Sequence, residues 1–184
     1  MEGGARWTAR WSVAVCVALL GVSPCFAGQT SLSSRRVRSS DRALADLIGL
    51  ATRESKTFGQ LVASIETTNG IVYVEPGKCG HGVHACLEMW MNVSGPNRFL
   101  RIMIDGSKRH SDIETMSSIG HELQHAIEAL GDQTIKDGVT MFNFFKRLAP
   151  TDGNRFETTA AVNAGNAVYD ELRESASASL KGER

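Results

Sequence analysis

The sequence lacks an excess of charge of either sign. Its 184 residues include 20 lysines or arginines and 20 aspartates or glutamates, so the formal net charge is zero with histidine neutral. Nucleic acids and anionic membrane surfaces normally bind a patch of positive charge on a protein. We therefore expect no nucleic-acid partner.

Cysteine is also scarce, with only four residues, and no internal repeat is visible. Hydrophobic residues make up 42% and charged residues 22% of the chain, which is the composition of an ordinary globular protein. A chain of this length buries roughly two thirds of its unfolded surface and needs no disulfide scaffold. We expect a single compact domain over residues 41–173.

Long apolar runs are absent. The longest, residues 12–22, is shorter than the roughly 20 apolar residues that a membrane span requires. It follows Arg6 and Arg10 and is followed by small residues ending at Ala27, an order typical of a secretory signal peptide. We expect residues 1–27 to be cleaved, which leaves a secreted or periplasmic protein without a stable membrane span.

The cysteine positions agree with export. Cys16 and Cys25 fall in the predicted signal peptide, so the mature chain keeps Cys79 and Cys86, seven positions apart. In an oxidising compartment this pair is most simply a local disulfide. The segment also contains His81 and His84, and clusters of cysteine and histidine can instead bind zinc.

Apolar spacing predicts helices at both ends of the domain. Residues 28–40 are rich in serine and arginine and are predicted to form a flexible leader. Asp41 is placed to cap a first helix, and residues 58–65 carry the apolar spacing of a second. Helical spacing returns after Ser111, and residues 174–184 are expected to be a frayed tail.

Residues 71–104 alternate between apolar and polar side chains, which is the pattern of strands. Pro76 and Gly77 end the first strand, and the sequence SGPN separates the last two. We expect a three-stranded antiparallel meander packed with helices, an α+β fold.

The most informative motif is HELQH at residues 121–125. It lies in a predicted helix that has a capping box at Ser111 and Glu114. His121 and His125 are four positions apart, so both rings can reach one metal ion. On a helical wheel they fall opposite the apolar arc, which places them on the solvent side of the helix.

A catalytic zinc ion normally has three protein ligands, so a third is required. Glu157 is our candidate, at the start of the inward face of a helix from about Arg155 to Arg173. It could instead pair with a cation such as Arg147 or Arg155. Glu128 is interpreted as orienting a ligand ring or as surface charge. The other candidates as third ligand are His81, His84, His110 and Asp132.

With these residues the chain resembles the zincin metallopeptidases that have a gluzincin-type site of two histidines and a glutamate. It is also similar to small exported bacterial proteins of unassigned function that share an HELQHA helix and an FET segment. The resemblance implies that His121, His125 and Glu157 hold Zn²⁺ and that Glu122 is the general base. The metzincin pattern is absent, because Ala126, Ile127 and Glu128 follow the motif directly.

These residues predict an exported zinc-dependent peptidase that hydrolyses peptide bonds in a peptide or protein substrate by a metal-activated water. An inactive zinc-stabilised binding or structural protein is one alternative, and a metal amidase acting on a non-protein amide is another. Arg155, His110 and Tyr169 are candidates by type for stabilising the oxyanion.

Overall fold

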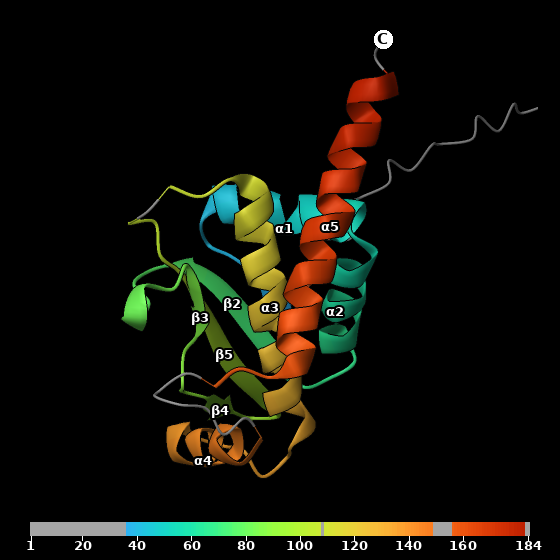
Figure 1. Cartoon of the computed structure of the whole chain (residues 1–184). Coiled ribbons are helices and arrows are strands. Elements are labelled where there is room, and N and C mark those ends of the chain that lie inside the picture. The colour runs from blue at the N-terminus through green and yellow to red at the C-terminus, as the bar shows by residue number, and fades with distance from the viewer. Residues whose placement is uncertain (1–35, 108, 149–155, 183–184) are drawn as a thin grey trace, which may run out of the picture. The chain divides into compact units, whose positions relative to one another are not determined.

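The structure is a computed structural model that describes residues 36–107, 109–148 and 156–182 (Figure 1). The predicted signal peptide lies outside these residues. The described part has a mixed α+β architecture. Its helices are α1 (Arg42–Glu54), α2 (Lys56–Glu66), α3 (Asp112–Gly131), α4 (Gly138–Leu148) and α5 (Thr159–Gly182), and its strands are β1 (Val37–Arg38), β2 (Gly70–Pro76), β3 (Ala85–Leu87), β4 (Asn92–Ser94) and β5 (Asn97–Ile104).

The strands form one five-stranded sheet with the order β1-β2-β5-β3, and β4 also pairs with β5. β2 is parallel to β5, with Val72 opposite Leu100, whereas β3 and β4 are antiparallel to β5. The expected antiparallel meander is therefore wrong, because β2 and β5 are parallel and β5 lies between β2 and β3. The alternating pattern identifies strands but not their neighbours, and residues 77–96 are long enough to return the chain for parallel pairing.

The first helix begins at its predicted cap, and the second covers the residues predicted to be helical. The Asp41 carboxylate accepts a hydrogen bond from the Leu44 N–H at 2.9 Å, and Ser55 caps α2 in the same way. Phe58 and Ile65 are completely buried between α2 and its neighbours. α3 packs against α2, α5 and strands β2, β3 and β5, so it is the central helix of the domain (Figure 1).

Two segments that were predicted to be flexible contain regular structure in their described residues. Val37, within the expected leader, is 2% exposed and pairs with Val72, because its apolar side chain joins the core at the edge of the sheet. α5 continues through the expected frayed tail to Gly182, and the Ser175 hydroxyl donates a hydrogen bond to Glu54 at 2.7 Å. Packing against α1 therefore extends this helix beyond its apolar pattern. None of the helices in the described ranges has the length and hydropathy to cross a membrane.

The predicted disulfide is confirmed. The sulfur atoms of Cys79 and Cys86 are 2.09 Å apart, and the bond joins the loop after β2 to strand β3. These two cysteines are therefore not metal ligands in this structure.

Candidate metal centre

α3 carries three of the four predicted site residues, and both of its ends are capped. The Ser111 hydroxyl accepts from the Glu114 N–H, and the Glu114 carboxylate accepts from the Ser111 N–H, which confirms the capping box. At the other end the buried Arg98 guanidinium donates to the carbonyl groups of Leu130 and Asp132. These contacts satisfy helix-terminal groups that would otherwise lack partners, so α3 is a well-defined support.

The histidine face of α3 is not a solvent face. His125 is 5% exposed and Glu122 is 8% exposed, because Phe145 of α4 packs against the His125 ring and Leu87 of β3 contacts the Glu122 carboxylate. Of the three site residues on α3, only His121 is partly open to solvent. The helical wheel separated the site from the apolar arc correctly, but it could not show that a strand and a second helix enclose the site.

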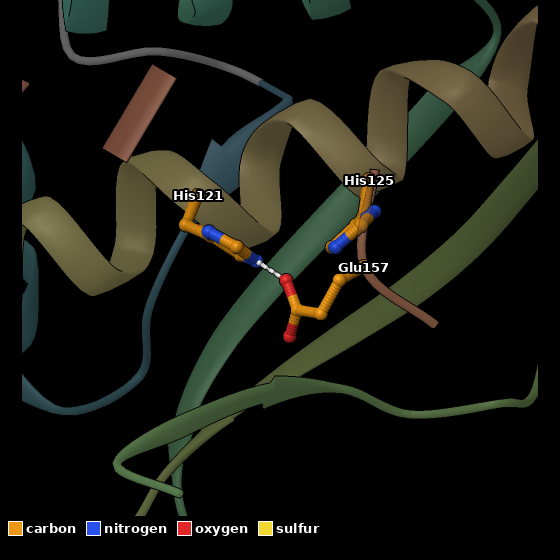
Figure 2. A group of neighbouring side chains, drawn as sticks. All are labelled: His121, His125 and Glu157. Atoms are coloured by element: carbon orange, nitrogen blue, oxygen red, sulfur yellow. Dashed lines mark ion pairs between the residues drawn. The ribbon is translucent and has the colours of Figure 1, made fainter. Parts of the chain in front are cut away.

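The fold brings His121, His125 and Glu157 together (Figure 2). One donor atom from each lies within 4.8 Å of the other two, and His121 Nε2 is 3.1 Å from a Glu157 carboxylate oxygen. Ligands of one tetrahedral zinc ion lie roughly 3.3 Å apart. Small side-chain adjustments would therefore allow all three residues to bind a single ion.

The His121 ring has an environment that favours its neutral form. Burial and then the neighbouring His125 lower the pKa of His121 below its ordinary value. A neutral imidazole and a carboxylate are both electron-pair donors suited to a divalent transition metal. The donor set of two imidazoles and one carboxylate fits a metal ion.

Glu157 reaches the site from a different element than predicted. α5 begins at Thr159, so Glu157 lies in the segment before the helix and not on its inward face. Its side chain is 46% exposed, and it is therefore not a buried charge. The predicted close approach of α5 is present, since a Cβ atom at Gly165 would lie 3.2 Å from the His121 Cβ.

Glu128 links the two sides of the centre. Its carboxylate accepts hydrogen bonds from His125 Nδ1 at 3.0 Å and from the Thr158 hydroxyl at 2.7 Å. The bond to Nδ1 leaves Nε2 of His125 as the atom available to a metal. Burial alone would raise the pKa of Glu128, but these hydrogen bonds lower it below its ordinary value. Burial alone would lower the pKa of His125, but the hydrogen bond to Glu128 raises this pKa above its ordinary value.

Thr158 is the residue that sequence reasoning missed. Its hydroxyl also accepts from the Ala161 N–H at 3.1 Å, so it caps α5 while it holds the segment that carries Glu157. A threonine three positions before the first buried residue of a helical pattern is a recognisable cap signal. Its bond to Glu128 depends on the tertiary structure and has no sequence signal.

Glu122 is the buried acid of the motif. One carboxylate oxygen accepts a hydrogen bond from the Leu87 N–H of β3 at 2.7 Å. Burial raises the pKa of Glu122 to about 7, against the opposing effects of His125 and of this hydrogen bond. The carboxyl group can therefore take up or release a proton near neutral pH.

The other candidate ligands lie elsewhere. His84 and His110 stack on each other with ring centroids 3.7 Å apart, and the two nitrogens of His84 contact Asp105 and Thr115. Asp132 accepts hydrogen bonds from Thr134. Within residues 36–107, 109–148 and 156–182, no second group of three metal-binding side chains is present. Arg155 and the His81 side chain lie outside the described residues.

Comparison with known proteins adds no further assignment. No protein family, curated protein or solved structure matches this chain. The functional argument therefore depends on the geometry and chemistry of the centre itself.

Proposed function

We propose that this protein is an exported zinc-dependent peptidase, with His121, His125 and Glu157 as the zinc ligands. The observation that carries the proposal is the position of Glu122, a buried carboxyl group with its pKa raised to about 7 between two histidines of a metal-binding group. A purely structural site has no need of a protonatable carboxyl group at this position. We include in this proposal the resemblance of the sequence to the zincin metallopeptidases.

Zinc, when bound, supplies polarisation of the scissile carbonyl and acidification of water. The chain's own residues supply proton transfer and alignment. Glu122 accepts a proton from the attacking water and delivers it to the leaving amine nitrogen, a role that requires a pKa near the working pH. Glu128 holds the His125 ring by its Nδ1, which fixes the direction of Nε2.

Strand β3 gives a substrate a place to bind. It lies at the end of the sheet order and pairs with β5 on one side only among the described strands. Leu87 of β3 donates to Glu122, so this strand runs directly beside the proposed general base. An extended peptide could add to its free edge by main-chain hydrogen bonds.

The Cys79–Cys86 disulfide supports an oxidising compartment, because disulfides are rare in reducing ones. Export through the predicted signal peptide is consistent with this bond. We propose a secreted or periplasmic location for the mature chain.

The proposal is tested with Glu122→Gln, which keeps the shape of the side chain and removes its proton-transfer chemistry. We expect the variant to bind zinc with wild-type stoichiometry and to lose hydrolysis of an unfolded, fluorescently labelled protein by about 100-fold or more. Metal content is measured by elemental analysis of the same samples. If wild type and variant both bind zinc and neither hydrolyses protein or small amides, the proposed enzyme is wrong and the zinc-stabilised binding protein is correct.

A further inference from the structure

Two cavities meet at the metal centre, and their walls differ in chemistry. The first, named here the apolar pocket, has a volume of about 180 Å³. Cavities of about 150 Å³ with apolar walls accommodate a benzene ring. Its walls are formed mainly by Val83, Leu87, Met89, Phe145 and Phe156.

The apolar pocket is built on a fixed aromatic wall. Phe145 is 1% exposed, and its ring lies edge-on to the ring of His125 with centroids 5.5 Å apart. Phe156 stacks against Phe145 at 6.2 Å and directly precedes Glu157 in the chain. An apolar group in this pocket would therefore lie immediately beside two of the proposed zinc ligands.

The second cavity, named here the polar pocket, has a volume of about 250 Å³ and lies between α3, α5 and the segment before β3. Apart from the carboxyl groups of Glu122 and Glu157 and the apolar Val83 and Val162, the side chains on its walls are small or uncharged and polar. They include Ser117, Ser118 and Asn166, together with His84 and His121.

Both pockets include Glu122 and Glu157 in their linings, so the two cavities adjoin at the proposed reaction centre, with the apolar pocket beside His125 and the polar pocket beside His121. Neither lining includes a lysine or an arginine among the residues that the structure describes. A substrate carboxylate in the apolar pocket would lose its hydration without gaining a cationic partner, which is costly.

We propose that the substrate is a peptide with a leucine- or phenylalanine-sized side chain on one side of the cleaved bond and a small uncharged polar residue on the other. The apolar side chain occupies the apolar pocket, and the polar residue occupies the polar pocket. This inference rests on the proposed function, because it places the cleaved amide between the two cavities.

Binding to the apolar pocket can be measured without turnover. Two matched amino-acid hydroxamates, one with a leucine and one with an aspartate side chain, serve as probes that bind a metal through the same group. We expect the leucine probe to bind the zinc-loaded protein at least tenfold more tightly, as measured by calorimetry. Equal affinity for the two probes, or no binding of either, would overturn the inference.

Two variants that each add a positive charge test whether the preference for the leucine probe arises in the apolar pocket. Met89→Lys places a cation in the apolar pocket, and it should reduce the preference for the leucine probe at least tenfold. Val139→Lys adds the same charge at a residue that is 70% exposed and outside both linings, and it should leave the preference unchanged. An equal effect of the two variants would contradict the assignment of the apolar pocket.

The hydrolysis experiment separates this inference from the proposed function. Fragments from an unfolded protein mixture, sequenced by mass spectrometry, should show apolar and small polar residues enriched on opposite sides of the cut. Cleavage without this enrichment overturns the inference and leaves the peptidase intact. A leucine preference in the probe assay without cleavage of any substrate overturns the peptidase and retains the apolar pocket as a binding site.

Discussion

The two sides of the candidate metal centre are held in different ways. His121 and His125 project from α3, a helix of 20 residues that is capped at both ends and packed at the centre of the domain. Glu157 lies on a short segment before α5 and is held through the hydrogen bond from its neighbour Thr158 to Glu128. The histidines are therefore fixed by a packed helix, whereas the glutamate lies on a segment held by the Thr158–Glu128 hydrogen bond and by the stacking of Phe156 on Phe145.

The largest effect on zinc affinity is expected from removing a histidine on α3. His125→Ala should weaken zinc binding on the order of a thousandfold, because it removes one of few ligands that share a binding free energy of many kcal/mol. Affinity is measured by competition with a coloured chelator. His110→Ala is the matched control, since this histidine stacks on His84 outside the group. A similar loss in both variants would indicate that the effect is not specific to the centre.

Removing the ligand on the second side should have a smaller effect. Glu157→Ala is expected to weaken zinc binding about 10- to 100-fold, because a water molecule can replace an exposed carboxylate as the third ligand. The same chelator competition measures the change. A loss as large as that of His125→Ala would contradict the proposed difference between the two sides, and unchanged affinity would remove Glu157 from the ligand set.

Loss of the Thr158–Glu128 hydrogen bond, which joins the two sides of the centre, should have the next largest effect on zinc affinity. Thr158→Val removes the hydroxyl that donates to Glu128 and is expected to weaken zinc binding about tenfold, within the range for residues that orient ligands. Thr158→Ser keeps the hydroxyl and should restore most of the affinity. If the serine and valine variants bind zinc equally well, this hydrogen bond does not position Glu157.

The smallest effect on zinc affinity is expected in the middle of α5, away from the metal centre. Glu171 accepts hydrogen bonds from Ser55 and from the backbone and hydroxyl of Thr57. Glu171→Gln should leave zinc affinity unchanged while it reduces the free energy of unfolding by about 1 kcal/mol, measured by urea denaturation.

The same residue gives the stability of the domain a dependence on pH. Burial alone would raise the pKa of Glu171, but the hydrogen bonds from Ser55 and Thr57 lower it below its ordinary value. A group with a lowered folded pKa stabilises the fold above its unfolded pKa, and this contribution is lost as the pH falls through the folded pKa. Glu171→Gln should therefore reduce the acid-induced loss of stability, as followed by thermal unfolding of the metal-free protein. An unchanged pH profile would contradict this assignment.

Local patterns predicted the parts of this protein that depend on neighbouring residues. The Asp41 cap, the capping box at Ser111 and the Cys79–Cys86 disulfide are all confirmed. The spacing of His121 and His125 placed both rings on one face of α3, because four residues make about one helical turn.

Features that depend on contacts between distant segments were not predictable in the same way. The insertion of β5 between β2 and β3 is set by packing over the whole sheet. The burial of His125 depends in part on Phe145 of α4, which lies 20 positions away and packs its ring edge-on against the imidazole. The start of α5 at Thr159 is fixed in part by Thr158, whose hydroxyl also bonds to Glu128, 30 positions away. Glu157 therefore lies before α5 and not within it, yet it remains beside the two histidines.

The most direct test of the central claim is an anomalous difference map from crystals of the zinc-loaded protein. We expect one strong peak, with Nε2 of His121, Nε2 of His125 and a carboxylate oxygen of Glu157 each within about 2.2 Å of it. A peak ligated by other residues, or a carboxylate of Glu157 turned away from a metal that both histidines bind, would contradict the account.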